Sequence, residues 1–318
     1  MISEGYLRRH VHAYNTNREV ALLDVAEEYI LEFMRRQGFF DGILVFKGGT
    51  ALRKYVFGPS GRFSTDLDFG LVADDPGYVN LVFDTLDGAN LLGVRVRLEN
   101  RDAAAARLRI DTDLGPVDVP AAISVRAQAP WLPAVHRRPE PFEFLDRGLA
   151  GDFSRASLPI LDLREITAEK IAAFWRRRKA RDLYDLEHLG RALQAEFDGL
   201  TIGSLAALKV YFDVVDEGLG HPPTDIRDIF RCTTKDVEGI DDLGRFQARA
   251  TDAGNLLAQC SQRYSALPQV DDGILRVVTT CSLRDRYRAL ELRDSLVSRL
   301  VGPTPSSHHR GPVIDEAG

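Results

Sequence analysis

The sequence predicts an α+β protein, in which a small mixed sheet with helices is followed by a helical C-terminal half. Short apolar or alternating segments, typical of strands, lie between residues 43 and 125. From Leu163 onward, apolar residues recur at helical spacing instead. The expected divisions are a domain with N-terminal helices over residues 1–160, a helical domain over 161–301 and a disordered tail over 302–318.

The first half of the chain carries the segments expected to build the sheet. Residues 18–36 have apolar residues at helical spacing with acidic residues between them, and Gly38 ends that helix. Apolar and acidic residues alternate at the start of 66–72, which predicts a strand. The other expected elements are strands over 43–46, 94–98, 106–110 and 117–125, helices over 50–57 and 78–86, and a loop over 58–64.

The second half is expected to be helical throughout. The predicted helices cover residues 167–179, 182–193, 202–215, 243–266 and 283–300. The segment from Gly302 has no apolar periodicity, which favours disorder.

Composition excludes several classes of protein. The chain has 318 residues, of which 44% are hydrophobic and 28% charged, as is ordinary for a globular protein in water. Cys232, Cys260 and Cys281 are far apart, so they form neither a metal-ligand motif nor a disulfide framework. No apolar run reaches the roughly 18 residues that a membrane helix needs. The N-terminus has no apolar signal core, so we expect a cytoplasmic protein without a membrane partner.

The net charge of −6 does not favour nucleic-acid binding by the whole surface. Any nucleic-acid contact must come from a local basic patch. Five cations within residues 176–181 form the candidate patch.

A glycine turn follows the first expected strand. Gly48 and Gly49 would let the backbone approach a phosphate closely, and the N–H groups at the start of the next helix would face that anion. Thr50 can cap the helix and hydrogen-bond a phosphate oxygen. Taken alone, the motif more often marks a tight turn that binds nothing.

A pair of carboxylates follows about 16 residues after Thr50. On a strand, Asp66 and Asp68 would project from one face, about 6.6 Å apart along the chain. Two carboxylates so arranged suit one or two Mg²⁺ ions, with Mn²⁺ as an alternative. A surface strand can also carry this pattern by chance. Three intervening cations are expected to add positive charge to the site: Arg53, Lys54 and Arg62.

A third carboxylate is expected on a neighbouring strand. Asp118 is the leading candidate, because Val117 and Val119 on either side of it indicate a strand with the carboxylate on the opposite face. Asp111 and Asp113 are rival candidates from the same hairpin.

Charged residues also mark the first two helices of the second half. Lys170 and Arg177 share one helix face and could hold the β- and γ-phosphates of an NTP or an acceptor backbone. Asp182 and Asp185 lie near one another on the next helix, and Asp182 could orient Lys170 or an arginine. The alternative is a solvated pair of helices joined by surface salt bridges.

These motifs together resemble a known family. Phe46–Lys54 and Arg62–Phe69 are similar to the first signature of the AbiEii/AbiGii-type toxins, which include the mycobacterial MenT toxins. Glu169–Ala173 and Arg181–Leu186 resemble the second and third signatures. The resemblance covers about residues 40 to 190 and implies a polymerase-beta-like nucleotidyltransferase core.

The resemblance implies a role for each matching position. Asp66 and Asp68 fall on the metal-binding carboxylates, Lys170 on the essential lysine, and Asp182 on the essential aspartate of the arginine-aspartate motif. With Asp118 added, these are the expected catalytic residues, and Asp66, Asp68 and Asp118 the expected metal ligands. The residues expected to bind the nucleotide are Lys47, Gly48, Gly49, Thr50, Ser64, Arg177 and Arg181.

Membership of such a family would imply a toxin that transfers a nucleotide from an NTP. In some members the acceptor is the 3′ end of tRNA, which blocks aminoacylation, and a cognate antitoxin restrains the toxin. An enzyme that modifies proteins or antibiotics is the first alternative. A protein that binds NTPs without turnover is the second.

Overall fold

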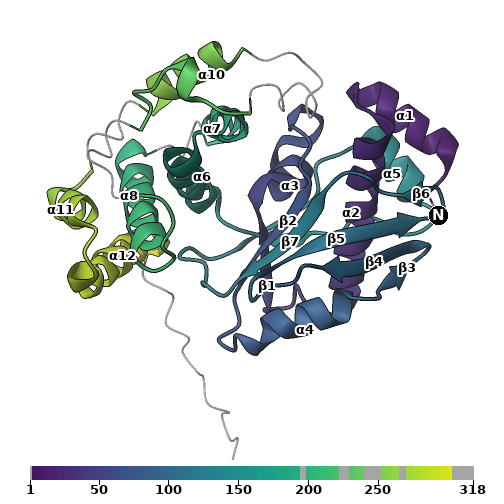
Figure 1. Cartoon of the computed structure of the whole chain (residues 1–318), viewed down its shortest axis with the longest axis horizontal. Coiled ribbons are helices and arrows are strands. Elements are labelled where there is room, and N and C mark those ends of the chain that lie inside the picture. The colour runs from purple at the N-terminus through teal and green to yellow at the C-terminus, as the bar shows by residue number, and fades with distance from the viewer. Residues whose placement is uncertain (1, 194–197, 222–228, 240–251, 265–269, 303–318) are drawn as a thin grey trace, which may run out of the picture.

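A computed structural model describes residues 2–193, 198–221, 229–239, 252–264 and 270–302, and the account of the structure concerns these residues. A twisted sheet with helices against it forms one part, and a group of helices forms the other (Figure 1).

The sheet is mixed, as predicted. Its strands are β1 (Leu44–Lys47), β2 (Asp66–Leu71), β3 (Asn90–Leu91), β4 (Val94–Glu99), β5 (Ala105–Thr112), β6 (Gly115–Pro116), β7 (Ala121–Arg126), β8 (Val135–Arg137) and β9 (Leu158–Ile160). They run in the order β3-β4-β5-β7-β2-β1-β9-β8, with β6 paired to β5. β2 is antiparallel to β1, the strand before it in the sequence, and parallel to β7, which comes from a later part of the chain.

Helices cover one face of the sheet. The helices α2 (Arg18–Arg36) and α4 (Gly77–Leu86) pack with β3 and β4 around a small apolar gap that Val94 and Val96 also line. α1 (Glu4–Tyr14) and α5 (Glu143–Leu149) lie against each other beside α2. On β7 the buried residues Ala121, Ile123 and Val125 alternate with partly exposed ones. This period of two separates a core face from an open face.

The chain changes its helical hydrogen bonding just after β1. The helix α3 (Gly48–Leu52) continues into one π-helical turn, Arg53–Phe57, and then a 3₁₀ turn, Gly58–Ser60. The π-helical turn directs Arg53 and Lys54 inward, where both are almost completely buried.

A buried charge cluster anchors that turn to α2. The carboxylate of Asp24 accepts hydrogen bonds from Arg53 at 3.1 and 3.2 Å, from Lys54 at 3.0 Å and from His10 at 2.9 Å. Lys54 also pairs with Glu27 at 3.3 Å. The expectation that Arg53 and Lys54 supply charge to the phosphate site is therefore wrong, because both side chains form ion pairs inside the core.

The second part of the chain is helical in the described residues beyond β9. Its α-helices are α6 (Leu163–Arg177), α7 (Ala180–Ala192), α8 (Gly199–Val215), α10 (Ala253–Arg263), α11 (Asp272–Thr280) and α12 (Arg286–Val301), with 3₁₀ turns at Thr234–Asp236 and Leu283–Asp285. α6 packs against α7 and α8, which in turn contact the remaining helices. Arg178 has a left-handed backbone (φ 47°), which ends α6 and separates it from α7.

Most of the expected elements are confirmed, with one consequential error. The helix over 18–36 has the predicted bounds, and the strand over 66–72 ends one residue early. The strand expected over 117–125 begins only at Ala121. Elements not foreseen are α1, α5, α11, β3, β6, β8 and β9.

Some expectations are left open by the structure. Residues 243–251 and 265–266 of the expected helix 243–266, and nearly all of the expected tail, lie outside the described residues, although α10 falls within that helix. The division of the chain near residue 160 stays a prediction, with β9 ending at Ile160. All three cysteines are free. Within the described ranges, no helix combines the length and the apolar composition needed to cross a bilayer.

Candidate active site

The glycine turn and the carboxylate pair meet at the end of β1. Lys47 is the register partner of Asp68 across the antiparallel β1–β2 pair, so Gly48 begins beside that carboxylate. Gly48 has φ +77°, and a Cβ atom placed there would lie 2.3 Å from Oδ2 of Asp68. Both the backbone conformation and the contact therefore require glycine at this position.

The two carboxylates project from the same face of β2. Leu67 and Phe69 are fully buried on the other face, while Asp66 and Asp68 are partly exposed. Ser124 on β7 donates a hydrogen bond of 2.7 Å to Oδ1 of Asp68. Burial raises the pKa of Asp66, and the neighbouring charge of Asp68 raises it further. The carboxylates are thus close enough to repel one another.

The carboxylate pair differs from the other acids around it. Glu165, Glu169, Asp182 and Asp185 are each ion-paired with a lysine or arginine. In the described part of the chain, neither carboxylate of the Asp66–Asp68 pair has a cationic group within ion-pair distance. Two mutually repelling carboxylates without a cationic side chain fit a divalent cation, which carboxylate oxygens bind well.

Asp118 does not complete this pair as expected. It precedes β7 and is exposed, because the valines beside it are not part of a strand. The β7 residues that lie opposite Asp66 and Asp68 are Ala122 and Ser124. The described residues contain no group of three or more His, Cys, Asp or Glu side chains that could hold a metal. The strand context predicted for Asp118 is therefore wrong, and a cluster of three carboxylates does not form.

The rival acids lie elsewhere on the same hairpin. Asp111 is the register partner of Arg95, and Asp113 lies 3.9 Å from that arginine. Neither joins the pair on β2.

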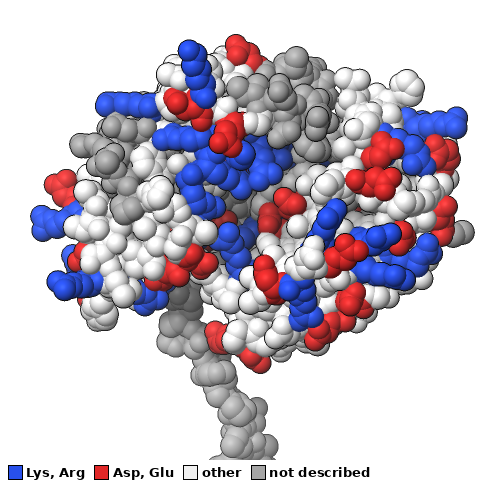
Figure 2. All heavy atoms as spheres, in the orientation of Figure 1, with Lys and Arg blue, Asp and Glu red and all other residues white. Residues whose placement is uncertain are grey.

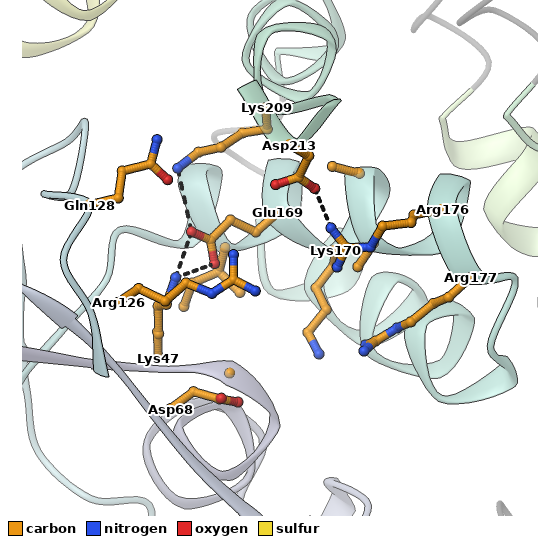
Figure 3. A pocket seen from close by; sticks show the side chains of 14 residues that line it. Lys47, Asp68, Arg126, Gln128, Glu169, Lys170, Arg176, Arg177, Lys209 and Asp213 are labelled. Carbon is orange, nitrogen blue, oxygen red and sulfur yellow. Dashed lines mark hydrogen bonds and ion pairs between the residues drawn. The ribbon is translucent and has the colours of Figure 1, made fainter. Parts of the chain in front are cut away.

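A cavity of about 140 Å³ opens beside Asp68, between the sheet and α6. Six cations and three carboxylates are among the residues that line it. The cations are Lys47, Arg126, Lys170, Arg176, Arg177 and Lys209. In Figure 3, Lys170 and Arg177 extend from α6 toward Asp68. The excess of positive charge suits a polyanion such as a triphosphate.

Buried carboxylates of α7 hold the two cations that extend from α6. Asp182 accepts two hydrogen bonds from Arg177, at 2.7 and 2.8 Å. Asp185 lies 2.7 Å from Lys170 and accepts two hydrogen bonds from Arg62, at 2.7 and 2.9 Å. Because Asp182 and Asp185 are buried, the alternative of a solvated helix pair is wrong.

Asp185 and Arg62 are residues whose positions the sequence analysis did not foresee. Arg62 was expected to add positive charge to the site; it pairs with Asp185, and its charge also acts on Asp66 and lowers the pKa of that carboxyl. A signal existed in the sequence, since Asp185 follows Asp182 by three residues and so shares its helix face.

Glu169 links the sheet to the helical part at the back of the cavity. It accepts hydrogen bonds from Lys47 at 2.9 and 3.1 Å and from Lys209 at 3.4 Å (Figure 3). Burial by itself raises the pKa of Glu169, but the charges of Lys47 and Lys209 outweigh it and lower the pKa to about 2. Lys47 is therefore held at the cavity wall by its ion pair with Glu169.

Three further charged lining residues were missed: Arg126, Lys209 and Asp213. Lys209 and Asp213 had a signal, because they are the only charged residues of the mostly apolar helix α8. No sequence pattern indicated Arg126, because its position beside the cavity depends on the register between β7 and β2.

Thr50 has another role than the one expected. It is fully buried, and its hydroxyl donates a hydrogen bond of 2.7 Å to the backbone oxygen of Asp66. The helix start has no side-chain cap. The expected cap by Thr50 is therefore wrong, and its hydroxyl instead fixes the strand that carries the carboxylates.

Gly49, Ser64 and Arg181 are the remaining residues expected to bind the nucleotide. A Cβ atom on Gly49 would lie 2.7 Å from both Oγ of Ser64 and a guanidinium nitrogen of Arg62, so the loop before β2 packs directly on the turn. The charge of Arg181 acts on Asp66 and lowers its pKa, against the larger effect of burial. Arg181 does not line the cavity.

The basic segment 176–181 does not act as one patch. Arg176 pairs with Asp213 and Lys179 with Glu238, both at 2.5 Å. Arg178 lies over the rings of Phe174 and Trp175. Figure 2 shows Lys and Arg side chains gathered at the hollow between the two parts of the molecule. Within this segment, Arg176 and Arg177 line the cavity.

Because the carboxylate of Asp185 is ion-paired, we expect the stability of the fold to decrease at acidic pH. Burial alone would raise its pKa, but the charges of Arg62 and Lys170 lower it to about 2 from an ordinary 3.8. A lowered pKa contributes stability that is fully present above the ordinary value and is lost as the pH falls through the folded-state value. We expect the free energy of unfolding to fall between pH 4 and pH 2, and urea titrations of wild type and Asp185→Asn should measure a smaller pH dependence in the variant.

Comparison with known proteins identifies what the chain is similar to. Residues 32–269 match the family described as nucleotidyl transferase AbiEii toxin of type IV toxin–antitoxin systems. The solved structure of MenT4, a nucleotidyltransferase toxin from Mycobacterium tuberculosis H37Rv, is 30% identical, covers 93% of this chain and 99% of its own, and superposes with a TM-score of 0.84.

Two Helicobacter pylori structures are more distant. One is a putative nucleotidyltransferase with 18% identity and a TM-score of 0.44, covering 75% of this chain and 93% of its own. The other, JHP933, has 18% identity and a TM-score of 0.41, covering 92% and 98%. No curated protein matches the chain.

Proposed function

Because this chain belongs to the AbiEii family of nucleotidyltransferase toxins, we propose that it transfers a nucleoside monophosphate from an NTP to the 3′ end of tRNA. The family is that of type IV toxin–antitoxin systems, which implies a cognate antitoxin. The proposal therefore names three things: an NTP as donor, tRNA as acceptor, and the residues that act on both.

One observation carries the proposal: Asp66 and Asp68 share one face of β2 without an ion-pair partner among the described residues, and Asp68 lines a cavity together with six cations. Asp66 and Asp68 would hold Mg²⁺, with Mn²⁺ as the alternative. Nucleotidyltransferases of this family typically use a divalent metal. The bound ion would neutralise charge on the phosphates and favour ionisation of the attacking hydroxyl.

The chain's own residues would bind and orient the triphosphate. Lys170 and Arg177, fixed by Asp185 and Asp182, supply two oriented cations for the β- and γ-phosphates. Glycine at position 48 lets the backbone of the turn lie directly against Asp68, so that its N–H groups could approach a phosphate beside that carboxylate. Such positioning and electrostatic stabilisation supply most of the rate enhancement in phosphate transfer.

The proposed reaction is a substitution at the α-phosphorus. The 3′ hydroxyl oxygen of the acceptor forms a bond to the α-phosphorus and loses its proton to solvent water. The bond from that phosphorus to the bridging oxygen breaks, and pyrophosphate leaves with the electron pair. A new phosphodiester at the 3′ end is the product, which removes the hydroxyl that aminoacylation needs.

The test is a labelling assay with each of the four NTPs labelled at the α-phosphate. The purified protein is incubated with Mg²⁺ and either tRNA, lysate protein or an aminoglycoside. We expect label in tRNA, and no label in tRNA whose 3′ terminal ribose has been oxidised with periodate. Label in protein or aminoglycoside alone would contradict the proposed acceptor, and NTP binding without any transfer would contradict the proposed activity.

A further inference from the structure

The face of the sheet that carries the carboxylates continues sideways across three more strands. Asp66 is the register partner of Ala122 on β7, which pairs with Arg107 on β5. Arg107 in turn pairs with Glu99 on β4. Directly paired residues on neighbouring strands project from the same face. The row therefore leads from the catalytic carboxylates to the outer strands without leaving that face.

Four arginines occupy this face on β4 and β5. Arg95, Arg97, Arg107 and Arg109 are exposed, whereas the residues between them point into the core. At about 4.8 Å per strand, β5 and β4 lie roughly 10 and 14 Å from β2. Figure 2 shows basic side chains, with acidic ones among them, over the place where Figure 1 has these two strands. We call the four residues the arginine face.

The arrangement of the arginine face works against the stability of the sheet. Arg97 and Arg109 are register partners, so two like charges stand directly opposite each other, which destabilises a strand pair. Arg97 and Arg107 form no ion pair with any described residue. A purely structural surface would favour opposite charges at these positions.

The acids on this face neutralise it only in part. Glu99 lies 3.7 Å from Arg109, and Asp113 lies 3.9 Å from Arg95. Both pairs are exposed, with about half of each side chain open to water. Asp111 is the other acid on these strands. Exposed pairs of this kind are weak and exchange readily for a polyanion.

We propose that the arginine face binds the phosphodiester backbone of the nucleic-acid acceptor, whose 3′ end reaches Asp66 and Asp68. This inference rests on the proposed function, because it presumes an acceptor that is a nucleic acid. Phosphates repeat at short intervals along a strand, and exposed arginines pair with them bidentately. The chain as a whole has a charge of −6, so the concentration of arginines beside the site is local.

A protein partner fits this surface less well. The centre of a protein interface is typically apolar or aromatic. On the open face of β4 and β5 the side chains are arginine, acid and alanine, with the larger apolar residues turned into the core.

The test is the triple variant Arg97→Ala, Arg107→Ala and Arg109→Ala, assayed for transfer of labelled nucleotide to tRNA. We expect the KM for tRNA to rise about tenfold or more, and the dependence of log KM on log salt to become shallower by about two to three. The kcat at saturating tRNA and the Kd for NTP should stay within about twofold of wild type. A matched control replaces three exposed arginines on helices, Arg147, Arg191 and Arg288, with alanine and should change none of these quantities.

A second variant separates binding from folding. Arg97→Glu places opposite charges across β4 and β5, so we expect a higher Tm together with a higher KM for tRNA. If the wild type labels tRNA and the triple variant keeps the wild-type KM and salt dependence, the arginine face does not bind the acceptor, while the proposed function stands. If wild type labels only protein, the proposed function fails, and the arginine face fails with it.

Discussion

Replacing Asp68 with asparagine is expected to reduce nucleotidyl transfer by about a thousandfold or more. The substitution removes one of the two negative charges that would hold the divalent cation, while the amide oxygen can still accept the hydrogen bond from Ser124. The fold should therefore persist. Single-turnover transfer of labelled nucleotide measures the first effect, and thermal unfolding measures the second.

Asp118→Asn is the matched control for this prediction. Asp118 is exposed and precedes β7, so its variant should keep transfer within about threefold of wild type. Wild-type rates in Asp68→Asn would show that the carboxylate pair is not the catalytic site. A large loss of transfer activity in Asp118→Asn would show that Asp118 does act as a third carboxylate, although it lies outside the strand.

Asp66→Asn tests the proposed metal site through thermal stability as well as activity. The pKa of Asp66 is raised by burial and by Asp68, so its ionised form costs stability above its ordinary pKa of 3.8. At pH 7 and without metal, Asp66→Asn should lose activity yet have a Tm equal to or higher than wild type. Adding Mg²⁺ should raise the Tm of wild type and leave that of the variant almost unchanged.

Replacing Asp185 with alanine is expected to cost about 3–5 kcal/mol of folding free energy and to abolish transfer. The carboxylate is 1% exposed and lies between Arg62 and Lys170, so its removal leaves two cations without their partner. Urea unfolding measures the stability, and the labelling assay measures the activity. Lys170 would lose the contact that fixes its position in the cavity.

A double variant separates these two effects. Arg62→Met with Asp185→Leu replaces the buried pair by apolar side chains, which often restores stability. We expect unfolding close to wild type with transfer still impaired, because Lys170 keeps only Asp182, at 3.7 Å. Recovery of full transfer would show that Asp185 acts through folding alone. Asp216→Ala, which breaks the exposed pair with Arg286, should cost less than about 1 kcal/mol.

The motifs of the proposed catalytic site could be located in the sequence because each depends on neighbouring residues. The alternation of Asp66, Leu67 and Asp68 determines which side chains share a face once a strand forms. The pair of glycines after an apolar run indicates a turn that larger residues cannot adopt. The AbiEii resemblance rested on these same local patterns, and the family match confirms it.

The predictions that failed were those about which charges meet. Arg53 and Lys54 are near the motif in sequence, yet one π-helical turn directs both into the core, away from the phosphate site. Arg62 stays beside Gly49, but its ion-pair partner is Asp185 on a distant helix. The strand expected around Asp118 failed because two valines beside an acid are compatible with a strand without requiring one.

The sequence alone therefore determined the fold class, the family and the residues of the carboxylate pair and the glycine turn. Only the tertiary structure decided which cations line the cavity and which acids hold them. The ion pairs Lys47–Glu169 and Arg62–Asp185 join residues 122 and 123 positions apart, across two parts of the chain. Charges attract any opposite charge within reach, so their pairing is set by how the sheet and the helices pack, which no local pattern encodes.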